Sequence, residues 1–327
     1  MQPQSRAPDL LRRFTPTPFE ADLNVMGRVM HLETNSLAVL EQARRLLGNS
    51  DRSRSECRNF IWRIVTEGGT DDPTWPEMTA FSQDGLSFAS IGQHGFLAVD
   101  ARQREAVAFI AEKLAKDTLG FGRPFLATLF TLSSPSMGLS PIWAACVAEG
   151  EAGLLIFGPP RSGKTVSAYL AGRFGLHFRA DRQVFLEATS AGLLAWGELW
   201  PACFYQDAQA VLPELIAVAR PFDCGGQTYL YLEKPRQADA PLCVRPAVCV
   251  FLERQDRHGH RLTPLHEDEF RRRLNEYRQF SDGLSRQLDQ SDAWNLLCRL
   301  PAFHLAHGSD PGVPARLFRD LIEGHES

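Results

Sequence analysis

The feature that most constrains the fold is the eight-residue stretch Gly158–Thr165, which reads GPPRSGKT. It matches the pattern G-x-x-x-x-G-K-[ST] of a phosphate-binding loop. The apolar run Leu154–Phe157 precedes it, and Val166–Leu170, which is compatible with a helix, follows it. The chain must therefore place a strand, a tight turn and a helix N-terminus in direct succession, and this order predicts an α/β unit.

The spacing of the loop has a chemical reason. Gly158 and Gly163 allow a tight turn in which backbone N–H groups point at phosphate oxygens, and the following helix adds the positive end of its dipole. The residues between the two glycines are expected to line the phosphates: Pro159, Pro160, Arg161 and Ser162. Lys164 should reach the β- and γ-phosphates as a point charge, and the Thr165 hydroxyl should ligate Mg²⁺. The motif thus predicts ATP and Mg²⁺ as ligands.

Asp181 is the acidic residue that the spacing brings closest to this loop. It lies sixteen residues after Thr165, within the expected strand His177–Glu187. A helix of about ten residues followed by a strand would return Asp181 to the γ-phosphate, where its carboxylate could accept a proton from a hydroxyl or bind the metal. The alternative is a salt bridge at the end of the strand, with Arg179 or Arg182 as the partner.

Other classes of phosphate-loop protein are less favoured by the remaining motifs. The chain has no L-S-G-G-Q signature of ABC proteins and no guanine-reading N-K-x-D. The apolar strand Val248–Glu253 ends in glutamate, whereas an ordinary ATPase of this class ends that strand in the aspartate that holds Mg²⁺. A plain NTP hydrolase with Glu253 near the metal therefore stays as the least favoured alternative.

The segment Gly175–Val184, GLHFRADRQV, resembles the HPr kinase/phosphorylase family, whose fold is also that of phosphoenolpyruvate carboxykinase. That family has G-H-R-L-V-A-D-D-R-V at this separation from its phosphate loop. The resemblance covers roughly residues 140–320 and extends to Trp200-Pro201, the strand Val248–Glu253 and the closing helix. It implies that Asp181 is the catalytic base.

The resemblance implies an enzyme that transfers phosphate from ATP, with Mg²⁺, to a hydroxyl, usually a serine of a protein or peptide, or a small molecule. It also implies a possible homo-oligomer. Two positions depart from the family: Arg182 replaces the second aspartate, and Trp143 falls where the family has a histidine, fifteen residues before Gly158. A catalytically degenerate ATP-binding partner or regulatory protein therefore remains an open alternative.

The fold class expected is α/β, with an N-terminal α+β accessory domain (residues 1–135) and a phosphate-loop domain of the HPr kinase type (residues 136–327). The turn-rich segment Ser133–Pro141 sets this boundary. Helices are expected over Leu37–Leu47 and over Arg102–Lys116, and Asp84-Gly85 predicts a hairpin turn.

Composition indicates which partners and which cellular compartment to expect. The net charge of −4 argues against a nucleic-acid partner, since such domains are usually basic. No run approaches eighteen apolar residues, and the N-terminus has no apolar signal segment, so no membrane span or export signal is expected. Seven cysteines without a C-x-x-C pair indicate reduced thiols. The cytoplasm is the expected compartment.

Overall fold

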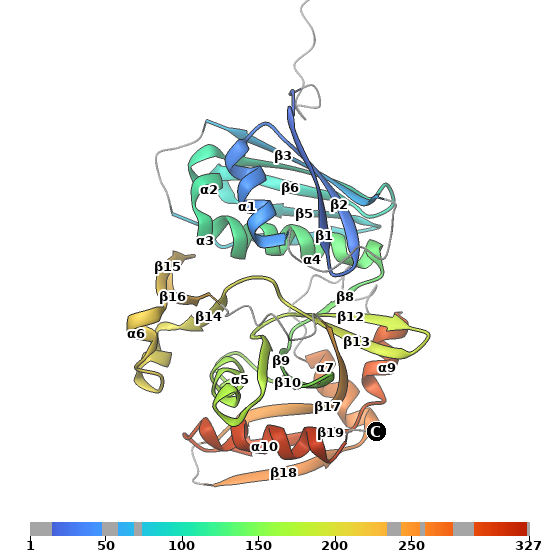
Figure 1. The fold of residues 1–327 in the computed structure, drawn as a ribbon, viewed down its shortest axis with the longest axis vertical. Coiled ribbons are helices and arrows are strands. Elements are labelled where there is room, and N and C mark those ends of the chain that lie inside the picture. Colours follow the sequence, from blue (N-terminus) through green and yellow to red (C-terminus); the bar gives the residue numbers. More distant parts are fainter. Residues whose placement is uncertain are drawn as a thin grey trace, which may run out of the picture.

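The computed structural model describes residues 15–47, 58–68, 74–233, 243–255, 259–276 and 291–325. Its order of elements is mixed α/β, with a seven-stranded sheet near the N-terminus, a nine-stranded sheet and a small three-stranded sheet. Helices lie between the first sheet and the rest of the molecule (Figure 1). The predicted α/β class is therefore confirmed at the level of a mixed α/β fold.

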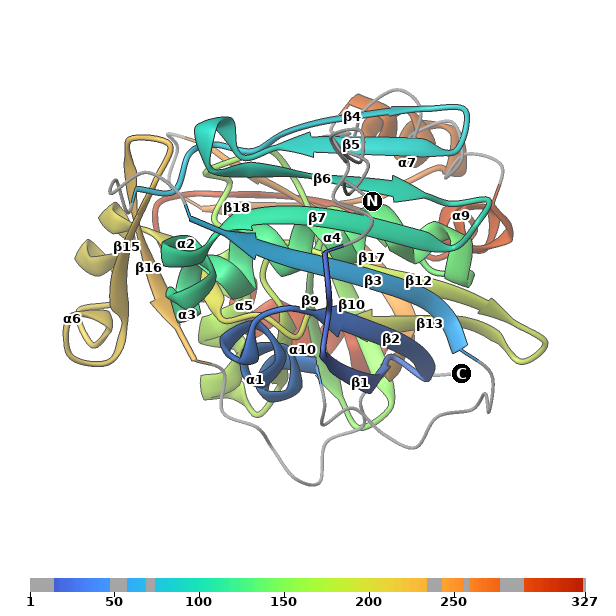
Figure 2. The ribbon, with the colours of Figure 1, turned by 90° about the horizontal axis from the view of Figure 1, so that it is seen from above.

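The first sheet has the strand order β1-β2-β3-β7-β6-β5-β4 (Figure 2). Its strands are β1 (Phe19–Val25), β2 (Arg28–Thr34), β3 (Arg58–Glu67), β4 (Thr79–Gln83), β5 (Leu86–Ser90), β6 (Gly95–Asp100) and β7 (Glu105–Ala111). The β2–β3 and β3–β7 pairs are parallel, and the others are antiparallel. Asp84 and Gly85 both have positive φ between β4 and β5, which confirms the predicted hairpin.

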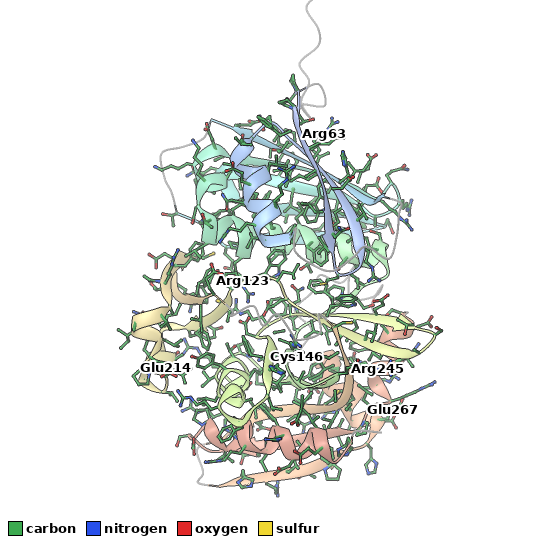
Figure 3. The ribbon with its side chains drawn as sticks, in the orientation of Figure 1. Arg63, Arg123, Cys146, Glu214, Arg245 and Glu267 are labelled. Carbon is green, nitrogen blue, oxygen red and sulfur yellow. The ribbon has the colours of Figure 1, made fainter. Side chains whose placement is uncertain are left out.

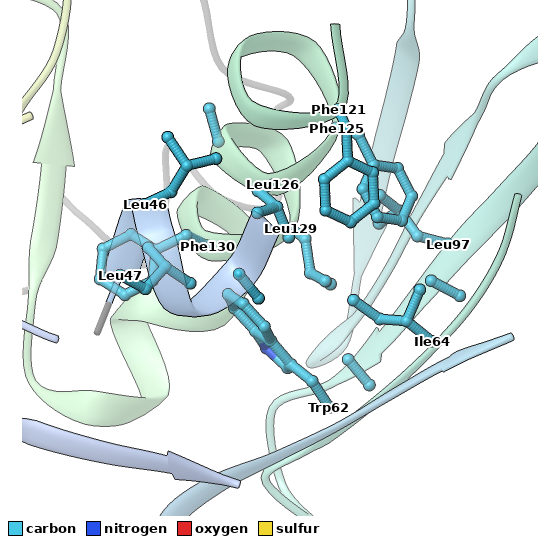
Figure 4. Packing of buried hydrophobic residues seen from close by; sticks show 14 of the residues in the cluster. Leu46, Leu47, Trp62, Ile64, Leu97, Phe121, Phe125, Leu126, Leu129 and Phe130 are labelled. Carbon is cyan, nitrogen blue, oxygen red and sulfur yellow. The ribbon is translucent and has the colours of Figure 1, made fainter. Parts of the chain in front are cut away.

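One face of this sheet is covered by helices. The helices are α1 (Leu37–Leu47), α2 (Glu112–Lys116), α3 (Thr118–Gly120), the π-helical η2 (Phe121–Leu126), α4 (Ala127–Ser133) and the 3₁₀ turn η3 (Ser134–Met137). Figure 4 shows Trp62 and Leu97 of the sheet facing the phenylalanines and leucines of this layer. Trp62 meets Phe130 edge to face, with the ring centroids 6.4 Å apart. The bounds of α1 confirm the predicted helix.

The predicted helix over Arg102–Lys116 is wrong in its first part. Glu105–Ala111 forms strand β7, between β3 and β6, and only Glu112–Lys116 is helical. The apolar residues of this run fit the spacing of a helix, but they include β-branched and aromatic side chains that pack well in a strand. Two neighbouring strands offer hydrogen bonds to the backbone, and this tertiary pairing decides the structure.

The second sheet carries the phosphate loop. Seven of its strands lie in the order β11-β9-β10-β17-β13-β12-β8, and β19 pairs with β17 and β18. The strands are β8 (Ser140–Ile142), β9 (Ala145–Glu149), β10 (Ala152–Phe157), β11 (His177–Ala180), β12 (Val184–Thr189), β13 (Gly192–Gly197), β17 (Cys243–Arg254), β18 (His260–Leu265) and β19 (Ala302–His307). Strands β10, β17 and β19 are parallel neighbours, so their carboxyl ends meet at one edge.

Alternating side chains of β10 and β17 are buried on opposite faces of this sheet. Leu154 and Ile156 pack with α5 (Lys164–Ala171) and α10 (Gly312–Glu323). Leu155 and Phe157 pack with α7 (Glu267–Glu276) and α9 (Asp292–Cys298). Both faces are thus covered, which explains why the strand before the loop is continuously apolar.

A small sheet lies beside the loop and completes the fold. Its order is β14-β16-β15, with β14 (Ala202–Tyr205), β15 (Arg220–Cys224) and β16 (Gln227–Leu232), and α6 (Leu215–Val218) lies between β14 and β15 in the chain. Phe130 of α4 meets Phe185 and Trp200, with centroid distances of 4.9 and 6.4 Å. The first sheet, its helices and the segment after the phosphate loop therefore share one core cluster.

The predicted strand His177–Glu187 is interrupted. Asp181, Arg182 and Gln183 form a turn between β11, which pairs with β9, and β12, which pairs with β8 and β13. None of the helices among the described residues is both long and apolar enough to span a membrane.

Candidate functional site

The phosphate loop connects the carboxyl end of β10 to the first turn of α5, as its sequence requires. Three of its residues have positive φ: Gly158 (141°), Arg161 (64°) and Gly163 (94°). A Cβ atom at Gly158 would lie 2.3 Å from the carbonyl oxygen of Leu252, so only glycine fits there. The Ser167 N–H donates to the Gly163 carbonyl at 2.8 Å, which starts the helix directly after the loop.

Lys164 occupies the centre of this loop. Its Nζ donates to the carbonyl oxygens of Gly158 (2.7 Å) and Pro159 (2.8 Å), and no described carboxylate forms an ion pair with it. Burial, together with the nearby charge of Arg182, lowers the pKa of Lys164 to about 8. The loop thus holds an ammonium group whose charge has no counterion among the described residues.

Two buried hydroxyl groups beside the lysine also lack a partner. Ser162 is 2% exposed and Ser167 is fully buried, and neither Oγ has a hydrogen-bond partner in the described structure. The Ser162 carbonyl accepts a hydrogen bond from Nε2 of His307, at the end of β19, at 3.0 Å. Buried hydroxyls are normally hydrogen-bonded. These groups therefore fit an oxyanion that supplies the missing acceptors.

Asp181 lies beside the loop through its backbone, not through its carboxylate. Thr165 Oγ1 is 3.5 Å from the carbonyl oxygen of Asp181. The carboxylate is fully buried and accepts from Arg123 Nη2, at 3.2 and 3.4 Å, and from the Cys203 N–H at 3.0 Å. Sequence alone suggested Arg179 or Arg182 as a salt-bridge partner, and the structure pairs Asp181 with Arg123 instead.

Glu198 completes this buried group, which we name the Arg123 cluster: Arg123, Asp181 and Glu198. One oxygen of Glu198 accepts from the N–H groups of Asp181 (2.7 Å) and Arg182 (3.2 Å). The other accepts from Arg123 Nη1 at 2.5 Å. Burial alone would lower the pKa of Arg123, but the two carboxylates raise it above its ordinary value. Arg123 lies at the junction of the helical layer and the second sheet (Figure 3).

The predicted Mg²⁺ ligands fit a metal unequally. The Thr165 hydroxyl stands in the first turn of α5, next to the loop, where it could serve as a ligand. The Asp181 carboxylate exposes no surface and faces Arg123 and the Cys203 amide. As placed, it does not fit a metal at the loop. Nor do the described residues contain a group of three or more His, Cys, Asp or Glu side chains arranged to hold a metal ion.

Two arginines and a tyrosine border the loop on the side of the small sheet. The guanidinium carbons of Arg161 and Arg182 lie 4.8 and 5.9 Å from the centroid of the Tyr205 ring. Arg182 also lies 5.5 Å from the centroid of Tyr229. Arg161 is exposed and pairs with Asp207 at 2.9 Å. Positive charge therefore gathers beside the loop from two elements, the loop itself and the turn after β11.

The carboxylate of the hydrolase hypothesis is engaged elsewhere. Glu253, the residue required for a plain hydrolase, accepts a hydrogen bond from His304 at 2.7 Å, and its side chain is 47% exposed.

Sequence reasoning did not select Arg123 or Tyr205. A signal for Arg123 was present, because it is the one charged residue within the apolar segment Leu119–Leu132, and an arginine in such surroundings needs a buried carboxylate. Tyr205 carries no comparable signal.

Comparisons with known proteins add little to this geometry. No protein-family model matches the chain, and no curated protein matches it. Among solved structures, the Hpr(Ser) kinase/phosphatase from Coxiella burnetii is similar at 13% identity and a TM-score of 0.28, over 57% of this chain and 89% of that one. A similarity this low does not define a shared fold.

Proposed function

We propose that the chain is an ATP-dependent kinase of the HPr-kinase-like type, which binds ATP at Gly158–Thr165 and transfers the γ-phosphate to a hydroxyl acceptor. The acceptor would be a serine of a protein or peptide, or a small molecule. One observation carries the nucleotide part of this proposal. The loop surrounds a lysine that has no counterion among the described residues, next to two buried hydroxyls without partners. A triphosphate would satisfy all three groups.

The residues of the loop have distinct parts in this proposal. Lys164 would leave the carbonyls of Gly158 and Pro159 and neutralise the phosphates. The backbone N–H groups at the start of α5 would donate to phosphate oxygens. ATP supplies the phosphoryl group. Mg²⁺, which neutralises developing charge on phosphates, would have the Thr165 hydroxyl as its protein ligand.

The transfer step depends on Asp181. In the kinase, this carboxylate would orient or deprotonate the acceptor hydroxyl, and it would have to leave Arg123 and the Cys203 amide to do so. Its burial in the Arg123 cluster favours a second candidate function, an ATP-binding partner or regulatory protein that does not turn ATP over. A hydrolase that depends on Glu253 is the third candidate.

Nucleotide binding is tested by calorimetric titration of ATP into the full chain. Lys164→Ala should weaken ATP binding at least about a hundredfold, since it removes a charge that would contact the phosphates directly. Lys116→Ala is the matched control, because Lys116 is exposed and pairs with Glu112. Equal affinity of the Lys164→Ala and wild-type chains would refute the proposal.

The three candidate functions differ in turnover. The wild-type chain, Asp181→Asn and Glu253→Gln are incubated with γ-labelled ATP, with and without serine-containing peptides. Label on a peptide that Asp181→Asn abolishes supports the kinase, whereas binding without turnover supports the regulatory protein. Phosphate release without an acceptor, impaired by Glu253→Gln, indicates a hydrolase.

A further inference from the structure

Arg182 is held in place beside the phosphate loop by its backbone. Its N–H donates to Glu198 of the Arg123 cluster at 3.2 Å. It directly follows Asp181, whose carbonyl oxygen lies 3.5 Å from Thr165 Oγ1. Thus only Asp181 separates the backbone of Arg182 from the first turn of α5. The turn after β11 therefore fixes the position of the Arg182 backbone next to the phosphate loop.

The side chain of Arg182 extends between the loop and the small sheet. Its guanidinium carbon lies within 6 Å of the ring centroids of Tyr205 and Tyr229, and Arg161 of the loop stacks on the same Tyr205 ring. Aromatic rings hold a guanidinium in place without neutralising its charge. Apart from a side-chain hydrogen bond with Tyr229, these contacts leave the guanidinium donors of Arg182 available to an anion.

Among the described residues, no carboxylate pairs directly with the Arg182 guanidinium, although burial, which would lower its pKa, is outweighed by nearby groups that include Asp181. Within the described part of the chain Arg182 makes no ion pair, because the neighbouring Asp181 and Glu198 are both paired with Arg123. The charge of Arg182 also acts on the loop: burial is the larger cause of the lowered pKa of Lys164, and the charge of Arg182 is the second. Because burial and the charge of Arg182 both disfavour the charged form of Lys164, an anion that joins the two cations would favour that form.

We infer that Arg182 is a fixed phosphate-binding residue, which contacts the terminal phosphate of the bound nucleotide together with Lys164. The inference rests on the proposed function. Arg182 lies on the side of Thr165, toward the residues that face the terminal phosphate in this type of loop. A guanidinium there provides positive charge that elsewhere depends on a metal held by carboxylates. ATP binding should therefore depend only weakly on Mg²⁺.

The experiment measures the affinities of ATP and ADP for the full-length wild-type chain, Arg182→Gln and Arg182→Lys, each with Mg²⁺ and with EDTA. Arg182→Gln should weaken ATP binding at least about tenfold, which is about 1.4 kcal/mol, and ADP binding less than threefold, because ADP lacks the terminal phosphate. Arg182→Lys keeps the charge and should recover part of the loss. In EDTA, the wild-type chain should lose less than tenfold in ATP affinity.

Arg173→Gln is the matched control, because Arg173 is exposed, pairs with Glu214 and lies outside the phosphate loop. It should leave the ratio of ATP to ADP affinity unchanged. Thermal unfolding of each variant verifies folding, and Arg182→Lys alone decides the matter if Arg182→Gln does not fold. A loss of three- to tenfold for ATP and not for ADP supports the inference.

Three outcomes would overturn it: equal effects of Arg182→Gln on ATP and ADP, no effect on either, or loss of wild-type ATP binding in EDTA. The experiment distinguishes failure of the proposed function from failure of this inference. If the wild-type chain binds no ATP, that function is wrong. If Lys164→Ala abolishes ATP binding while Arg182→Gln and Arg182→Lys match the wild type, only the role of Arg182 is wrong.

Discussion

Removal of Arg123 should destabilise the whole chain, and the structure allows the cost to be estimated. Arg123→Met keeps the length of the side chain but leaves two carboxylates, 0% and 1% exposed, without their counterion. Removing one partner of a buried ion pair costs about 3–5 kcal/mol, because the remaining charge stays buried. At about 2 °C per kcal/mol for a chain of this size, the midpoint of thermal unfolding should fall by about 6–10 °C.

The control is Arg319→Met. Arg319 also bridges two carboxylates, Glu149 at 2.9 Å and Glu323 at 3.0 Å, but its side chain is 46% exposed. Exposed ion pairs contribute little because solvent screens them, so its midpoint should fall by only a small fraction of the loss expected for Arg123→Met.

The triple variant Arg123→Met, Asp181→Asn, Glu198→Gln separates buried charge from lost packing. It removes both unpaired charges and should recover at least half of the loss, as measured by circular dichroism melts and urea titration. The reasoning is refuted if Arg123→Met costs less than 1 kcal/mol, or if the triple variant is no more stable than Arg123→Met.

Three further predictions test the loop and the core. Gly158→Ala should abolish ATP binding and destabilise the chain by roughly 2 kcal/mol, because its Cβ would meet Leu252 O; Gly172→Ala, where nothing lies within 4 Å, should be neutral in the same assays. Lys164, whose pKa is lowered to about 8, is charged at pH 7 and loses its proton as the pH rises. ATP affinity should therefore fall up to about tenfold between pH 7 and pH 9, and a flat profile in calorimetry would contradict this. Phe130→Ala should cost about 3–5 kcal/mol in urea unfolding, since it opens a cavity among three aromatic contacts; a cost below 1 kcal/mol would show that the site collapses.

The phosphate loop could be predicted because its information is local. Strand, glycines, lysine and helix follow one another in twenty or so residues, and each has a backbone reason for its place. The same holds for α1 and for the hairpin at Asp84-Gly85. Strand β7 could not be predicted in this way, because an apolar run of six residues fits either structure until β3 and β6 pair with it.

The surroundings of Asp181 were beyond local reasoning for a similar reason. Its counterion lies 58 residues earlier in the chain, and Glu198 lies 17 residues later. Spacing placed Asp181 next to the loop, and its backbone is there, but spacing says nothing about where a carboxylate points. The direction of the side chain follows from the burial of Arg123, which depends on how the helical layer packs.

That packing bears on how the chain can be dissected. Arg123 and Phe130 belong to the helical layer under the first sheet, yet they complete the charge and the core of the segment after the phosphate loop. A fragment that starts at residue 136 would lose both and would bury two negative charges alone. The shortest autonomous piece that keeps an intact phosphate loop should therefore begin before Arg123, and limited proteolysis should release no smaller folded product from the C-terminal side.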